Sequence, residues 1–199
     1  VVDGGLLSSF ENTPREKFVP ESLKPVSYYD ERIDLEGGRQ LLSPMVLSKM
    51  LQAAAPTIDD YVLNIGGGTR YGAAILSPVV STIIAVENKT YLRQAEKIWR
   101  SLGACNIVAE EGDLTKGSPE KGVYDLIIIE GASPSVPTEI ASQLSDNGRM
   151  VCIVKEPGRT MAQAVMVRAL GKNQISSYSL FECAANYLEG FAPDPAFRF

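Results

Sequence analysis

The stretch YVLNIGGGTRYGAAIL, residues 61–76, decides the fold of this chain. Its first five residues form a short apolar run that ends at Gly66, Gly67 and Gly68, and residues 70–76 have the composition of a helix. Glycines after a strand let the backbone approach a ligand closely, and a helix that begins there offers free N–H groups. The stretch predicts a strand, a ligand-binding loop and a helix, with a ligand-free glycine turn as the alternative.

The chain on the C-terminal side repeats this alternation of strand and helix. Helices are expected at 91–102 and 136–144, and further apolar runs lie at 81–87, 106–113, 124–132 and 148–154. Continuous apolar runs separated by amphipathic helices are typical of a parallel sheet covered on both faces. With right-handed crossovers, this order gives a doubly wound α/β sheet.

The two ends of the chain differ from this central pattern. A short helix is expected at 6–12, followed by proline-rich loops with a small hairpin, and then a helix capped by Ser43 with Pro44 at its first position. Near the C-terminus, two strand-like segments flank Gly171-Lys172-Asn173. They favour an antiparallel hairpin, although the first segment also has residues typical of a helix. The tail, 190–199, is expected to be extended and packed on the domain.

These segments predict one domain with three parts. Residues 1–55 form an N-terminal cap and substrate-side segment, 56–157 a cofactor-binding core, and 158–199 the C-terminal hairpin and tail. A chain of 199 residues is long enough to bury a single core of this kind.

The composition excludes several classes of function. The chain has no histidine, which rules out serine–histidine hydrolysis and imidazole proton shuttling. Three scattered cysteines without histidine argue against a zinc site and suit a reducing cytoplasm. The net charge of −5, without a run of lysine or arginine, argues against a nucleic-acid partner. We expect no membrane partner, because no apolar run reaches the length of a span.

The loop also indicates which ligand is bound. A dinucleotide fingerprint that starts at Gly66 needs a glycine where Tyr71 stands, so this fingerprint is absent. Methyltransferases of this fold use a looser glycine loop, and the mismatch therefore favours S-adenosylmethionine over a nicotinamide cofactor. Glu87 ends the second strand of the sheet, where an acid binds both ribose hydroxyls. Asp113, after Gly112, is placed to accept from the adenine amine. Taken alone, each acid is also compatible with an ordinary strand end or turn.

Several stretches together resemble the protein-L-isoaspartate O-methyltransferase family. They are PREKFVP (14–20), VSYYDERIDLEGGRQLLSPMVLSKML (26–51), the glycine loop, AVENKTYLRQA (85–95), EGDLTKG (111–117) and VPTEIASQLSDNGRMV (136–151). The resemblance runs from about residue 10 to 155 in the family's order and spacing. It implies the family's Rossmann-like, mostly parallel seven-stranded sheet, S-adenosylmethionine as methyl donor, and repair of peptides or proteins that carry isoaspartate.

The same resemblance implies the site residues. The expected cofactor contacts are Asn64, Gly66, Gly67, Gly68, Thr69, Glu87, Asn88, Gly112, Asp113, Leu114 and Glu130. The expected substrate contacts are Tyr29, Leu42, Ser43 and Pro44, with Ser43 as the candidate catalytic hydroxyl. The acceptor carboxylate is already ionised at neutral pH, so methylation needs positioning and exclusion of water rather than a general base.

Three positions depart from the family pattern. Leu42 stands where the family has its active-site hydroxyl, Asn64 replaces an acid on the first core strand, and Arg70 replaces the last glycine of the loop. Two alternatives therefore stay open beside isoaspartyl methylation. One is a methyltransferase with another acceptor, and the other is an inactive relative that binds the cofactor or a partner without catalysis.

Overall fold

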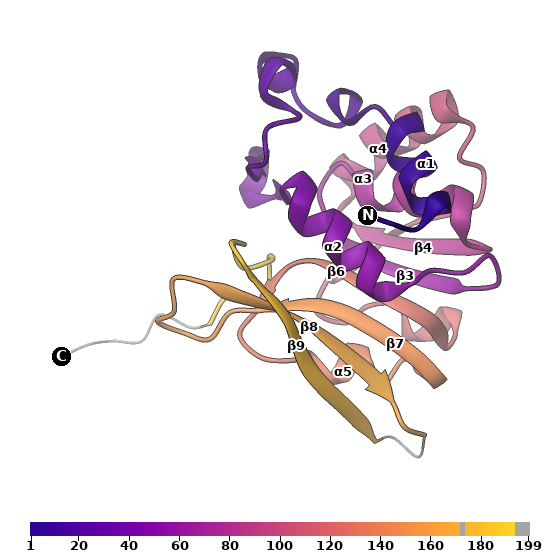
Figure 1. Cartoon of the computed structure of the whole chain (residues 1–199), viewed down its shortest axis with the longest axis vertical. Coiled ribbons are helices and arrows are strands. Elements are labelled where there is room, and N and C mark those ends of the chain that lie inside the picture. The colour runs from indigo at the N-terminus through magenta and orange to yellow at the C-terminus, as the bar shows by residue number, and fades with distance from the viewer. Residues whose placement is uncertain (172–173, 194–199) are drawn as a thin grey trace.

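The computed structural model describes residues 1–171 and 174–193, and it contains the predicted seven-stranded sheet (Figure 1). The strand order is β5-β4-β3-β6-β7-β8-β9, and β8 runs in the direction opposite to that of the other six strands. The strands are β3 (Tyr61–Gly66), β4 (Thr82–Glu87), β5 (Ile107–Glu111), β6 (Tyr124–Ser133), β7 (Leu144–Val154), β8 (Ala162–Ala169) and β9 (Ile175–Cys183). The doubly wound α/β prediction is confirmed.

Helices and short turns complete the fold. The helices are α1 (Gly4–Asn12), α2 (Pro44–Ala54), α3 (Tyr71–Leu76), α4 (Lys89–Leu102) and α5 (Thr138–Ala141). Short 3₁₀ segments are η1 (Arg15–Phe18), η2 (Glu21–Val26), η3 (Glu36–Gly38), η4 (Ser77–Val79) and η5 (Pro119–Lys121). The small N-terminal hairpin pairs β1 (Ile33–Asp34) with β2 (Gln40–Leu41).

The core lies on both faces of the sheet, because neighbouring strand residues point to opposite sides. Val62 belongs to the apolar cluster that packs under α1 to α4, while Leu63 belongs to the second cluster, which includes Ile140 of α5 and Leu188. Both side chains are fully buried. This burial explains the continuous apolar runs of the sequence.

Capping residues set where two of the helices begin. Ser43 Oγ accepts from the Val46 backbone N–H (3.2 Å), and Pro44 is the first residue of α2, as expected. Asn88 Oδ1 accepts from the Tyr91 backbone N–H (3.1 Å), so α4 begins at Lys89, two residues earlier than expected.

The predicted helix at 136–144 is mostly wrong. Only α5 is helical there, and β7 already begins at Leu144, which pairs with Tyr124 of β6. The Tyr124 backbone N–H donates to the carbonyl of Gln143 (2.8 Å), so pairing with the neighbouring strand takes the backbone out of the helix. The composition of residues 136–144 does not reveal that strand pairing with Tyr124 competes with helix formation there.

At the C-terminal end, β8 and β9 form the antiparallel hairpin, and the alternative helix over the first segment is wrong. The turn residues 172–173 lie outside the described residues, as does 194–199 of the tail. Within the described ranges, no helix is both long and apolar enough to cross a membrane.

Candidate functional site

The site lies at the carboxyl ends of the parallel strands, where the sheet reverses its order. Chain order runs outward from β3 to β4 and β5 on one side, and from β6 to β7 on the other. Gly66 at the end of β3 pairs with Glu130 of β6 across this reversal. Ligands of doubly wound sheets bind in the crevice at such a point.

The loop after β3 has the left-handed backbone that glycine permits. Gly66, Gly67 and Gly68 have φ values of 75°, 80° and 53°. Arg70, with φ 67°, continues this conformation as the residue before α3, so the expected helix begins one residue later, at Tyr71. A side chain at such a φ is uncommon and is held by its surroundings.

Arg70 is held because its guanidinium folds back into the protein. It is fully buried, and its Nη2 and Nη1 groups donate to the carbonyls of Asn64 (3.0 Å for Nη2) and Gly66. Burial lowers the pKa of Arg70 to about 10, although nearby carboxylates oppose this shift. The side chain therefore braces the glycine loop from within.

Asn64 and Glu130 form the next part of the same network. Asn64 Nδ2 donates to Glu130 Oε1 (2.9 Å), and both side chains are buried. A methyl group built on Gly67 would lie 2.8 Å from Glu130 Oε2, so the carboxylate lies directly against the loop. A carboxyl group from the neighbouring strand therefore lies beside Asn64 at the glycine loop.

Replacement of Glu130 by Gln is expected to stabilise the protein at neutral pH. Burial raises the pKa of the Glu130 carboxyl, although Asn64 and nearby arginines oppose the shift. A raised folded-state pKa means that folding favours the protonated acid. The stabilisation of the folded state by protonated Glu130 is complete below the pKa of the unfolded chain, near 4. It is lost as the pH rises through the pKa of Glu130 in the folded protein.

Thermal unfolding of Glu130→Gln and of the unsubstituted chain, from pH 7 down to pH 4, tests this expectation. The melting temperature of the variant should be higher at pH 7, and the difference should narrow towards pH 4. The exposed Glu120→Gln serves as the matched control. A variant that is less stable at pH 7 would contradict the assignment.

Glu87 ends β4 as predicted and is fully buried. The Arg39 side chain binds it in a bidentate manner, with Nε 3.0 Å and Nη2 2.9 Å from Glu87 Oε1 and Nε 3.2 Å from Oε2. The Asn88 backbone N–H also donates to Glu87 Oε1 (2.9 Å). Arg39 was not predicted from the sequence, where its role is indicated only by the need of a buried strand-end acid for a cationic partner.

Arg39 also contacts a residue from the far end of the chain. Its Nη2 lies 2.5 Å from an exposed Glu189 carboxylate oxygen. Burial opposes the charge of Arg39, but hydrogen bonds and attraction from Glu87 and Glu189 outweigh it and raise the pKa of the guanidinium.

The turn after β5 holds the remaining acid. Asp113 is exposed, and its Oδ1 accepts from the backbone N–H (2.8 Å) and hydroxyl (2.7 Å) of Thr115. These hydrogen bonds lower the pKa of Asp113. Gly112 is exposed, and Leu114 is buried in the second apolar cluster, the one that includes Ile140 and Leu188. The second Asp113 oxygen, Oδ2, is left for another donor.

The expected substrate residues lie around the N-terminus of α2. Tyr29 is 64% exposed, Pro44 is half-buried, and Ser43 is 8% exposed. Leu42 is fully buried and faces the core, and its carbonyl accepts from Arg15 Nη2 (2.7 Å). Position 42 therefore offers no hydroxyl group, and the hydroxyl at the N-terminus of α2 is that of Ser43.

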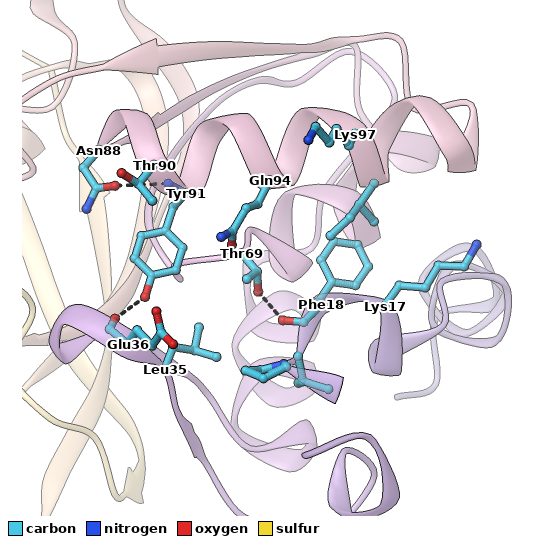
Figure 2. A pocket seen from close by; sticks show the side chains of 13 residues that line it. Lys17, Phe18, Leu35, Glu36, Thr69, Asn88, Thr90, Tyr91, Gln94 and Lys97 are labelled. Carbon is cyan, nitrogen blue, oxygen red and sulfur yellow. Dashed lines mark hydrogen bonds between the residues drawn. The ribbon is translucent and has the colours of Figure 1, made fainter. Parts of the chain in front are cut away.

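Figure 2 shows a separate cavity of about 670 Å³ between α4 and the N-terminal segments. It is lined by two of the expected cofactor residues, Thr69 and Asn88, together with Lys17, Phe18, Val19, Pro20, Leu35, Glu36, Thr90, Tyr91, Gln94, Lys97 and Ile98. The Thr69 hydroxyl donates to the Phe18 carbonyl (2.6 Å). Glu87 and the three glycines do not line this cavity. Over residues 1–171 and 174–193, no acidic or cysteine cluster is suited to a metal ion.

Sheet order, glycine loop and buried strand-end acid define the Rossmann-like class of S-adenosylmethionine-dependent methyltransferases. The model of the protein-L-isoaspartate(D-aspartate) O-methyltransferase family matches residues 2–183. The chain belongs to that family, which uses S-adenosylmethionine to methylate isoaspartyl residues, and the predicted family and enzyme class are confirmed.

Two relatives agree with this assignment, and two solved structures share the fold. Protein-L-isoaspartate O-methyltransferase 2 of Pelobacter propionicus is 34% identical over 179 residues, covering 89% of this chain and 79% of the relative. The enzyme of Pelotomaculum thermopropionicum is 35% identical, covering 83% and 72%. A solved protein-L-isoaspartate O-methyltransferase has the same fold, with TM-score 0.81 and 24% identity over 95% of this chain and 62% of that one. A putative Plasmodium falciparum relative, solved with S-adenosyl-L-homocysteine, has TM-score 0.77 and 15% identity, covering 95% and 92%.

The residue types of the site suit the family's cofactor, but other side chains of the protein occupy part of the space next to the glycine loop and Glu87. A carboxylate such as that of Glu87 is the type of group that accepts from ribose hydroxyls, the Asp113 carboxylate is the type that accepts from an amine, and the glycines permit close backbone approach. In this conformation, however, Arg39 holds Glu87, and side chains of Leu35 and Leu188 lie against Gly68 and Gly66.

Proposed function

We propose that this chain methylates the carboxylate of isoaspartyl residues in peptides and proteins, with S-adenosylmethionine as donor. The family assignment carries this proposal, and the placement of Glu87 at the carboxyl end of β4 beside the glycine loop supports it. In the bound state, the cofactor supplies a methyl group on a sulfonium. Glu87, Asp113 and residues 66–69 would hold it, while Glu130 braces the loop.

The acceptor would lie over the N-terminus of α2. Tyr29 provides an exposed aromatic surface there. The Ser43 oxygen already accepts from Val46, so its proton remains free to orient an acceptor carboxylate. A carboxylate is ionised at neutral pH, so the protein's contribution is to orient the acceptor and exclude water.

We further propose a cytoplasmic location. Cys105, Cys152 and Cys183 carry free thiols, and burial raises the pKa of the Cys152 thiol to about 12. Free thiols persist in a reducing compartment.

Transfer of a labelled methyl group from S-adenosylmethionine tests the proposed activity. A peptide containing isoaspartate should gain a base-labile methyl ester, and the same peptide with ordinary aspartate should not. Binding of S-adenosylhomocysteine without any transfer to the isoaspartyl peptide would reject isoaspartate as the acceptor.

The matched variant for this assay is Ser43→Asn. Asparagine keeps an N-cap acceptor but removes the hydroxyl, so stability should stay within about 0.5 kcal/mol. Turnover should fall about tenfold if the hydroxyl orients the acceptor, the usual effect of one hydrogen bond. Unchanged turnover would remove Ser43 from the site.

A further inference from the structure

Two distant segments of the chain meet over the predicted cofactor crevice. They are residues 35–40 and residues 186–189, and the two segments together are called the clasp. Gln40 Nε2 donates to the Asn186 carbonyl (2.9 Å), and the Asn186 backbone N–H donates to Gln40 Oε1 (3.0 Å). An ion pair between Arg39 and Glu189 is a third interaction between the segments. The two parts of the clasp are therefore locked to one another.

The clasp also fills the space where a ligand would approach the glycines. A methyl group built on Gly68 would lie 2.7 Å from Leu35 Cδ1 and 3.2 Å from Arg39 Cβ. One built on Gly66 would lie 2.8 Å from Leu188 Cδ1. The backbone surface that glycine leaves open is thus already covered by the chain itself.

Leu188 is anchored at the reversal point of the sheet. Its backbone N–H donates to the Ala132 carbonyl (2.9 Å), and the Ala132 N–H donates to the Asn186 carbonyl (2.9 Å). The Leu188 side chain is 3% exposed and also lies against Gly131 of β6. This part of the clasp occupies the crevice between β3 and β6.

Arg39 is the strongest link between the clasp and the core. Three hydrogen bonds join its guanidinium to Glu87, and both side chains are buried. Ribose hydroxyls are neutral donors, and they cannot match a bidentate guanidinium in a site shielded from water. Glu87 cannot keep these bonds to Arg39 and also receive both ribose hydroxyls.

The clasp segment 35–40 has room to move away from Glu87. Leu35 and Glu36 form the wall between the crevice and the cavity of about 670 Å³ in Figure 2. On the cavity side, the Tyr91 hydroxyl donates to the Glu36 carbonyl and holds the wall in place. Displacement of the wall towards this open volume would not disturb the sheet.

We infer that Arg39 competes with the cofactor ribose for Glu87 and sets the cofactor affinity of this enzyme. This inference rests on the proposed function, because it takes Glu87 as the ribose acceptor. Cofactor binds after Arg39 has left Glu87 and the clasp has opened. The apparent affinity is then the intrinsic affinity reduced by the fraction of open molecules.

Calorimetric titration with S-adenosylhomocysteine tests the inference in three variants of the full chain. Arg39→Gln removes the competing charge and should bind at least about tenfold more tightly than the unsubstituted chain. Glu189→Gln removes only the exposed partner of Arg39 and should bind about two- to fivefold more tightly. Arg32→Gln removes an exposed arginine of the same hairpin, which pairs with Asp34, and should leave the affinity unchanged.

Amide hydrogen exchange supplies a readout that needs no cofactor. The Leu35 N–H donates to the Arg39 carbonyl (2.7 Å) and the Leu188 N–H to Ala132, so both should exchange faster in Arg39→Gln but not in Arg32→Gln. Near-ultraviolet circular dichroism checks that Arg39→Gln is folded. Glu189→Gln provides the same comparison without altering a buried residue.

The outcomes separate this inference from the proposed function. Tighter binding by Arg39→Gln and Glu189→Gln supports it. Equal binding by all variants overturns the role of Arg39 and leaves the proposed function intact. No binding by any folded variant at millimolar ligand overturns both.

Discussion

Glu87→Ala is expected to lower the free energy of unfolding by about 3 kcal/mol, because it leaves the buried Arg39 without its bidentate partner. The expected loss lies at the low end for a broken buried ion pair, since Arg39 keeps its contact with Glu189. In the Arg39→Gln background, where no guanidinium competes for Glu87, Glu87→Ala should lower the affinity for S-adenosylhomocysteine by about 1–3 kcal/mol, the usual effect of losing charged hydrogen bonds.

Urea denaturation and calorimetric titration measure these two effects separately. The matched control is Glu111→Ala, because Glu111 is the register partner of Glu87 on β5 and ends its strand in the same way. Its carboxylate is exposed and lies 3.9 Å from Lys89 Nζ, so its removal should change stability by less than about 1 kcal/mol. Unchanged ligand affinity when Glu87→Ala is added to folded Arg39→Gln would remove Glu87 from the cofactor site.

Arg149→Met is expected to lower the free energy of unfolding by about 3–5 kcal/mol. Arg149 Nη1 and Nη2 bind the two Asp60 carboxylate oxygens at 3.0 and 2.7 Å, and Asp60 is 5% exposed. Its guanidinium also donates to the carbonyls of Ala54, Ala55 and Asp125. Loss of this side chain leaves the buried Asp60 carboxylate without its cationic partner, although it still accepts from the Thr57 backbone N–H (2.7 Å), and it removes the donors to the Ala54 and Ala55 carbonyls at the C-terminus of α2.

Arg168→Met is the control for this measurement. Arg168 is the register partner of Arg149 on β8 and is exposed, so its replacement should change stability by less than about 0.5 kcal/mol. Because β7 positions no residue of the predicted cofactor set, Arg149→Met should alter stability without altering ligand affinity in the folded protein. Similar losses in the two variants would contradict a specific role for the Arg149 network.

The local sequence was sufficient wherever one short stretch fixes one element. The run at 61–65 and its glycines predicted β3 and the positive-φ loop, because a buried strand and a left-handed turn each have a direct residue signature. Ser43 and Pro44 predicted the start of α2 because capping involves only neighbouring residues. Glu87 was placed at the end of β4 for the same reason.

Elements that depend on distant partners were predicted less well. The helix expected at 136–144 gives way to β7 because Leu144 pairs with Tyr124, twenty residues earlier. Arg70, which the sequence analysis identified only as a replacement for the last glycine of the loop, is buried because two carbonyls on β3 accept hydrogen bonds from its guanidinium. Propensity describes the isolated segment, whereas such pairings exist only after the chain has folded.

The sequence by itself determined the doubly wound sheet, the glycine loop and the identity of the family, since these depend on residue type and spacing along the chain. Only the tertiary structure decided what surrounds the loop. It placed Glu130 beside Asn64 and brought Arg39 and Leu188, 149 residues apart in the numbering, over the same crevice. The physical reason is that a buried charge takes its partner from whichever segment folding brings within hydrogen-bond distance, and separation along the chain does not reveal that segment.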